Sequence, residues 1–188
     1  MATVSRTLPS VTGHQLGPSA VGWLQEAGQK RGQQTGPSPV DRGKCGTALQ
    51  RACDGRAMPL GVVVTSANAN DGCHTQDLLA ALVVSPPAPT TPPVEAEVRS
   101  FPTAQADGAY GNQPARQRAK AAGFRLQAPS RGQRQPGVGK IRQAVERGHN
   151  FFAQFGRIGR RLDRSAKRFL GWIELAACVI FLRSGFVR

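Results

Sequence analysis

The fold of this 188-residue chain is decided by residues 98–127, which read VRSFPTAQADGAYGNQPARQRAKAAGFRLQ. This stretch predicts a strand over 98–106, a helix over 113–122 that ends at Gly123, and a short strand over 124–127. A strand, a helix and a strand in succession form a parallel crossover, which is typical of α/β proteins. We therefore expect an α/β fold.

Further elements are predicted upstream. Residues 47–53 and 59–65 predict two antiparallel strands around an Asp54-Gly55 turn, and residues 75–84 predict a helix with Thr75 as its N-cap. Five prolines within 85–93 exclude a helix or a central strand, so residues 85–97 are expected to be a linker or insertion. Residues 1–34 show no sustained period and predict a poorly ordered segment. A short apolar patch at 21–24 could form one turn or a strand, but nothing around it supports a stable element.

The C-terminal part is predicted to be helical and basic. Apolar residues from Ile141 to Leu162 recur at intervals of three, four or seven, which predicts one long helix. A second, more apolar helix is predicted over 166–183, with Trp172 as a core anchor. Nine basic residues against two acidic ones lie within 140–168, and this density favours phosphate contact over a merely solvated surface.

Composition narrows the class of protein. Lys and Arg number 25 against 11 Asp and Glu, which gives a formal charge of +14 and favours nucleic acid as the partner. The four cysteines form no C-x-x-C pair, so neither a zinc site nor a disulfide framework is expected, and a reducing cytoplasm is the simplest compartment. The apolar stretch 169–182 is too short to span a bilayer and contains Glu174, so no membrane role is expected.

Two isolated acids stand out in these basic surroundings. Asp107 follows the predicted strand over 98–106, and Glu146 lies within the long basic helix. Carboxylates can hold divalent metal while nearby cations hold the phosphates of a phosphodiester. The pair therefore suggests metal-assisted chemistry on nucleic acid.

Five ordered motifs carry a resemblance to a known family. Residues 35–44 (TGPSPVDRGK), 59–68 (PLGVVVTSAN), 106–110 (ADGAY), 144–147 (AVER) and 170–178 (LGWIELAAC) are similar to segments of bacterial insertion-sequence transposases with a DDE catalytic domain. Each motif alone is weakly specific, whereas their order is strongly so. The similarity covers residues 35–188, which would be the remnant of that catalytic domain.

The resemblance implies a ribonuclease H-like fold, a mixed sheet flanked by helices, that binds transposon-end DNA and cleaves and transfers its strands. Asp107 and Glu146 would be the second and third acids of the triad, and they would bind Mg²⁺ or Mn²⁺. Tyr110 would be a positioning group and Arg147 a phosphate clamp. The expected DNA contacts are Arg42, Lys44, Arg142, Arg147, Arg157, Arg160, Arg161 and Arg164.

The first acid of the triad is not matched. It should stand around residues 20–26, where Glu26 is the sole acid and its neighbours do not reproduce the family's strand. We therefore expect an incomplete sheet, impaired chemistry and a truncated or frame-disrupted origin, with weak metal binding. The alternative is a non-catalytic basic DNA-binding protein or regulator of transposition. Under either interpretation the expected partners are transposon-end DNA and a second copy of the chain or a full-length transposase, and the expected location is the cytoplasm, in association with the nucleoid.

Overall fold

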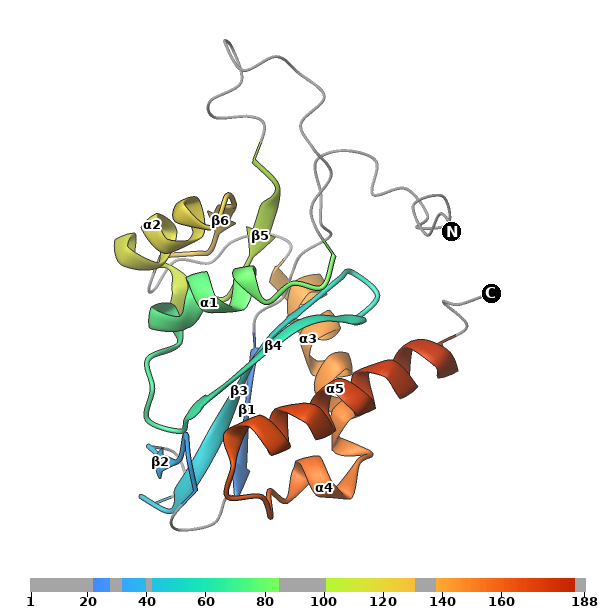
Figure 1. Cartoon of the computed structure of the whole chain (residues 1–188). Coiled ribbons are helices and arrows are strands. Elements are labelled where there is room, and N and C mark those ends of the chain that lie inside the picture. Colours follow the sequence, from blue (N-terminus) through green and yellow to red (C-terminus); the bar gives the residue numbers. More distant parts are fainter. Residues whose placement is uncertain (1–21, 28–31, 40–41, 85–100, 131–137, 185–188) are drawn as a thin grey trace.

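The structure, a computed structural model, describes residues 22–27, 32–39, 42–84, 101–130 and 138–184. Its centre is an antiparallel sheet in which one long strand pairs along both edges (Figure 1). The strands are β1 (Gly22–Ala27) and β4 (Pro59–Ser66) on the two edges of β3 (Cys45–Cys53), and β2 (Gly36–Pro37) beside the start of β3.

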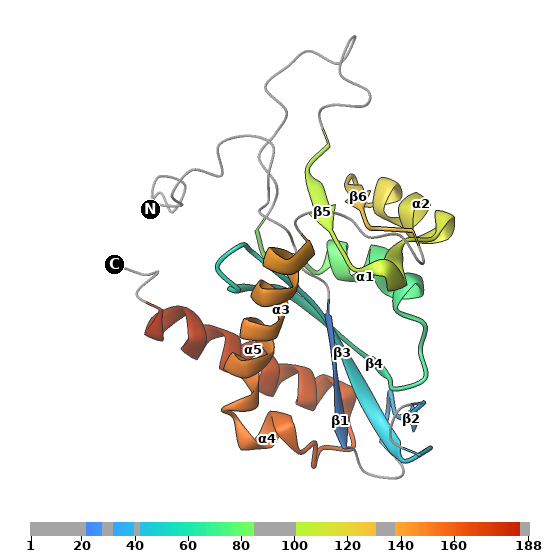
Figure 2. The same ribbon diagram turned by 180° about the vertical axis from the view of Figure 1, so that it is seen from behind.

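Two helical layers cover the two faces of this sheet. One layer contains α1 (Thr75–Ala80), α2 (Gln113–Ala121) and the parallel pair β5 (Thr103–Gln105) and β6 (Arg125–Gln127); it packs on Ala52 and Leu60. The other contains α3 (Val138–Ala153), α4 (Gly156–Gly159) and α5 (Ala166–Arg183), and packs on Leu49 and Met58 (Figure 2).

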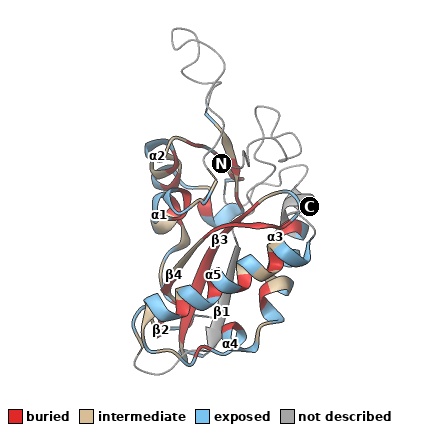
Figure 3. Cartoon of the chain, turned by 45° about the vertical axis from the view of Figure 1, so that its right-hand side comes forward, coloured by how far each residue is buried: buried red, intermediate tan, exposed pale blue. Residues whose placement is uncertain are grey.

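The alternation of side chains along β3 explains why it lies at the centre. Leu49 faces the layer of α3, α4 and α5, whereas Ala52 faces the layer of α1 and α2. Because both faces are covered, every residue of β3 after Cys45 is buried, as the red strand in Figure 3 shows. A strand buried on both faces is the most stable template in the sheet for its neighbours.

The predicted hairpin and crossover are confirmed. The Asp54 carboxylate accepts hydrogen bonds from the backbone N–H groups of Arg56 and Met58, both at 2.8 Å, and so closes the turn between β3 and β4. β5 and β6 pair in parallel, and α2 between them is capped by Asn112 and followed by Gly123 at a φ of +80°. The α/β class is therefore confirmed, with the parallel pair separate from the antiparallel sheet among the described residues.

The region before β5 differs in detail from its prediction. α1 ends at Ala80, and its N-cap position is His74 rather than Thr75. The 3-10 turn η2 (Asp71–His74), which Asn70 caps, precedes α1. Thr75 begins α1, and its hydroxyl donates to the Gly72 carbonyl at 3.0 Å. The Pro-rich segment and the start of the predicted strand at 98–100 lie outside the described residues.

β1 corrects the prediction that no stable element lies before residue 35. Its six residues pair in continuous register with β3, from Gly22 opposite Arg51 to Ala27 opposite Gly46. The strand gains its order from this long-range pairing with a buried template, which a local hydrophobic period does not report. The remainder of the predicted disordered segment, residues 1–21 and 28–31, lies outside the described residues.

The C-terminal helices also depart from the prediction. The expected single helix breaks after Ala153. The short α4 starts at Gly156 and ends at Gly159, and these two glycines weaken helical propagation beyond the break. The predicted helix over 166–183 is confirmed as α5. Trp172 is not a core anchor but is 39% exposed, since the buried face of α5 is formed by the neighbouring positions Phe169 and Ile173.

Candidate functional site

Asp107 lies at the start of a tight turn directly after β5. Ala106, which follows the last residue of β5, is buried, whereas Asp107 is exposed. One carboxylate oxygen accepts a hydrogen bond from the Ala109 N–H at 2.9 Å, and this contact caps the 3-10 turn η3 (Gly108–Tyr110). The turn therefore holds the carboxylate at the surface.

Tyr110 ties this turn to the central sheet. Its ring is 2% exposed, and its hydroxyl donates to the side-chain oxygen of Gln50 on β3 at 2.6 Å. The Gln50 amide donates in turn to the Asp71 carboxylate at 2.7 Å. Burial, and then the carboxylates of Asp71 and Asp107, raise the pKa of Tyr110 well above its ordinary value of 10.0, so the phenol remains a donor at neutral pH.

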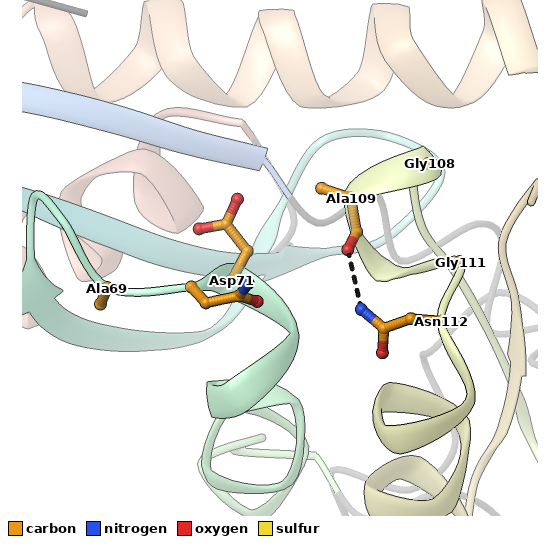
Figure 4. Close-up of a pocket in the computed structure, with 7 residues that line it drawn as sticks. Ala69, Asp71, Gly108, Ala109, Gly111 and Asn112 are labelled. Atoms are coloured by element: carbon orange, nitrogen blue, oxygen red, sulfur yellow. Dashed lines mark hydrogen bonds between the residues drawn. The ribbon is translucent and has the colours of Figure 1, made fainter. Parts of the chain in front are cut away.

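The turns η2 and η3 border one open hollow of about 580 Å³. Figure 4 shows Asp71 on one side and Gly108, Ala109 and Gly111 on the other, with Asn112 donating to the Ala109 carbonyl at 3.5 Å. Neither Gln50 nor Asp71 was singled out as a site residue from the sequence. The run ANAND at 67–71 could have indicated this turn, because Asn-Asp before Gly72 is typical of a capped turn rather than of a simple loop.

Glu146 lies on α3 at an exposed position, and Arg147 beside it is exposed as well. Buried positions on either side of these two residues hold the helix to the sheet. Ala144 is buried, and the Gly148 carbonyl accepts a hydrogen bond from the Arg51 guanidinium at 3.4 Å. β5 and the start of α3 lie toward the same end of the molecule in Figures 1 and 2. Among the described residues, no three His, Cys, Asp or Glu side chains gather closely enough to hold a metal ion.

The backbone register also locates Glu26. It lies opposite Thr47, whereas the end of β1 next to α3 is Gly22, which lies opposite Arg51. Four residues of strand correspond to about 13 Å. Glu26 therefore occupies the end of β1 that is remote from the α3 contact at Gly148, which does not favour it as a substitute for the missing first acid.

Most of the cations predicted to contact DNA lie at the surface. Arg42 and Lys44 are exposed on the turn between β2 and β3, and Arg42 adopts a φ of +49°. The side chain of Arg142 lies outside the description. Exposed cations cluster on α4, on the segment that follows it and on the first turn of α5: these are Arg157, Arg160, Arg164, Lys167 and Arg168.

Arg161 is the exception, because its burial corrects the prediction that it contacts DNA. It is 1% exposed, and its guanidinium donates to the carbonyls of Gln33, Gln34 and Asp163 and to the Thr47 hydroxyl. Its charge also lies over the Phe169 ring, 5.0 Å from the centroid. Burial lowers the pKa of Arg161, although the neighbouring Asp163 carboxylate opposes that shift. A side chain so enclosed holds the fold together instead of contacting a phosphate.

Comparison with known proteins supports the resemblance seen in the motifs. The chain is similar to a Burkholderia cepacia protein named "Putative transposase for insertion sequence element IS402", with 29% identity over 152 residues that cover 78% of this chain and 67% of the relative. No protein-family model matches the chain. The similarity supports a relationship to insertion-sequence transposases, while the DDE class and a truncated origin stay predictions.

Among the described helices, none combines the length and the apolar character needed to cross a bilayer. α5, the longest, carries a charged residue at Glu174 and alternates buried positions with exposed ones.

Proposed function

We propose that this protein binds DNA in the manner of an insertion-sequence transposase and that its strand chemistry is impaired. The observation that carries the proposal is the exposed basic segment 157–168, on a chain similar to the IS402 protein. Its DNA would be transposon ends, and it would act at the nucleoid in the bacterial cytoplasm.

Electrostatics favour a polyanion at this segment. Arg157, Arg160, Arg164, Lys167 and Arg168 are exposed, and the acids near them are Asp163 and Glu174. Of these, Asp163 is engaged by Arg157 at 3.4 Å, with its side chain 11% exposed. Cations that outnumber acids on one surface attract phosphates through counterion release, and this attraction does not depend on sequence. Arg147 and the Arg42 turn would extend the contact.

The arrangement of the acidic residues does not favour catalysis. Asp107 and Glu146 are both exposed, but Asp107 commits one carboxylate contact to its own turn, and among the described residues no three His, Cys, Asp or Glu side chains form a group that could hold a metal ion. Two-metal strand cleavage needs a full set of oxygen ligands in fixed positions. The described residues do not fit such a set, so we derive no catalytic step through Mg²⁺ or Mn²⁺, and any binding of either ion at Asp107 and Glu146 is expected to be weak.

The proposal is tested by matched pairs of charge deletions. Fluorescence anisotropy with labelled duplex DNA would compare Arg160→Ala/Lys167→Ala in the basic segment with Lys120→Ala/Arg125→Ala in the α2–β6 layer. Both pairs remove two exposed positive charges. We expect the first pair to weaken binding at least about tenfold more than the second, because direct phosphate contacts outweigh a change in net charge. Equal effects of the two pairs would contradict a DNA surface at segment 157–168.

A second candidate function is regulation without any chemistry, in which the chain occupies DNA ends or pairs with a full-length transposase. The register of Glu26, remote from the α3 contact, favours it. Nicking of supercoiled DNA with Mn²⁺ separates the two candidates. Cleavage that Asp107→Ala abolishes would exclude a purely regulatory protein, whereas binding without cleavage favours it.

A further inference from the structure

A groove on the basic segment combines charge with an exposed aromatic ring. It is an open space of about 470 Å³ between α4 and α5, lined by Arg157, Asp163, Arg168, Gly171, Trp172 and Leu175. Trp172 is 39% exposed and Leu175 is 55% exposed. The groove therefore places two exposed apolar side chains beside the cations Arg157 and Arg168.

The side chains of this groove are held in place by the fold. The Arg157 guanidinium lies 4.5 Å from the centroid of the Trp172 ring and contacts the Asp163 carboxylate at 3.4 Å. Asp163 is fixed in turn, because its backbone carbonyl accepts from the buried Arg161 side chain at 2.9 Å. The Trp172 ring is therefore oriented by a cation that is itself anchored to the core.

The groove also has room beside the ring. Gly171 precedes Trp172, and a side chain at this position would meet nothing within 4 Å. Arg168, which also lines the groove, is exposed one helical turn before Trp172 on α5. A flat group that lies against the indole would thus have a cation near enough to hold a neighbouring negative charge.

We propose that this groove binds an unpaired stretch of DNA, with a base stacked at Trp172 and the adjacent phosphates held by Arg168 and Arg157. An aromatic ring set among arginines is the chemistry of single-strand binding, because every base offers a flat face and every link carries a charge. A duplex hides its base faces, so it would use the cations of segment 157–168 but not the ring. The inference rests on the proposed function and adds a preference for unpaired strands.

Nucleic acid fits the groove better than a protein partner does. Arg157 and Arg168 line it, Arg160 and Lys167 are exposed in the same basic segment, and the Asp163 carboxylate is already engaged by Arg157. A hydrophobic protein interface usually has few charged residues at its core. The charge complementarity of this groove is therefore with a polyanion that also carries apolar rings.

Intrinsic fluorescence tests the inference, since the chain contains only two tryptophans, Trp23 and Trp172. A single-stranded oligonucleotide of about 12 nucleotides, within the usual range of site sizes, would be titrated into the full chain, and a duplex of the same length into a second sample. We expect saturable quenching with the single strand and weaker quenching with the duplex. Trp172→Phe should remove most of the quenching signal.

Affinity is then measured with a labelled single strand on variants of exposed apolar residues of α5. Trp172→Ala should weaken single-strand binding by about 5- to 150-fold, Trp172→Phe by much less because it retains a ring, and Leu182→Ala, an exposed apolar residue on the same helix, by less than about twofold. Far-ultraviolet circular dichroism verifies that each variant folds.

The outcomes separate this inference from the proposed function. Duplex binding without preference for single strands, or equal loss of both on Trp172→Ala, would overturn the inference and leave DNA binding intact. Absence of binding to either form would overturn the proposed function as well. A change in oligomeric state on Trp172→Ala, without any change in single-strand affinity, would overturn the inference in favour of a protein interface.

Discussion

Arg161 shows how one buried cation can connect distant parts of a chain. Its guanidinium links Gln33 and Gln34, before β2, with Thr47 on β3 and with the loop between α4 and α5. Its hydrogen-bond partners among the described residues are carbonyls and one hydroxyl. Such a residue stabilises by satisfying several carbonyls at once, and its removal leaves them without donors in a buried site.

Arg161→Ala is therefore expected to lower the free energy of unfolding by about 2–4 kcal/mol, since several buried acceptors lose their partner. Arg160→Ala, which alters an exposed neighbour, should change it by less than about 0.5 kcal/mol while weakening DNA binding. Urea denaturation provides the measurement. Equal stabilities of the two variants would show that Arg161 does not hold this region together.

Tyr110 gives a second residue-scale prediction, and it is the single tyrosine of the chain. Because burial and two nearby carboxylates raise its pKa, ultraviolet titration of the phenolate should show ionisation well above pH 10.0 in the folded protein and near 10.0 in denaturant. A phenolate midpoint near 10.0 in the folded protein would contradict the buried contact with Gln50.

The raised pKa of Tyr110 also makes the stability of the fold depend on pH. A folded pKa above the unfolded value means that the unfolded chain loses its proton first as the pH rises, so stability is fully present below pH 10.0 and falls above it. Tyr110→Phe cannot ionise, so its unfolding free energy should decline less steeply than that of the wild type above pH 10.0. Chemical denaturation across this range, with both proteins in the same buffers, measures the difference.

At the scale of elements, local signals predicted some parts of the fold and missed others. The hairpin of β3 and β4 and the crossover from β5 through α2 to β6 were predicted, because turn residues and short-range periods encode them. β1 was not predicted, because its order arises from pairing with β3, about 20 residues further along the chain. The break after α3 was missed since the apolar period continues past Ala153, where the helix ends, and through the two glycines of α4.

Substitution of two glycines by alanine is expected to have opposite effects on stability. A side chain at Gly111 would collide with the Pro129 carbonyl, which is backbone and cannot turn away, so Gly111→Ala should destabilise the η3 turn that carries Asp107. A side chain at Gly156 meets nothing within 4 Å, and this glycine begins α4, so Gly156→Ala should leave stability unchanged or raise it by up to about 1 kcal/mol. Thermal melts of the two variants should shift the midpoint downward for the first only.

At the scale of the whole molecule, the sheet separates two kinds of surface. The layer of α1, α2, β5 and β6 carries Asp107 and the hollow beside Asp71, whereas the layer of α3, α4 and α5 carries Glu146 and the basic segment. The sequence predicted which residue types would matter but not how they divide between layers. Arg161 and Trp172 show the reason: a charge run and an apolar period report composition, and burial depends on contacts between distant segments.

One measurement shows whether DNA binding depends on the cations alone or also on the two acids. It is the salt dependence of duplex DNA binding by the wild type and by Asp107→Ala/Glu146→Ala. If binding is electrostatic and independent of the acids, both proteins should give the same slope of log Kobs against log salt, about −3.6 to −5.4 for roughly four to six phosphate contacts. The variant should bind as tightly as the wild type or slightly more tightly, because two negative charges are gone. Loss of binding in the variant, or a slope near zero in the wild type, would contradict the account.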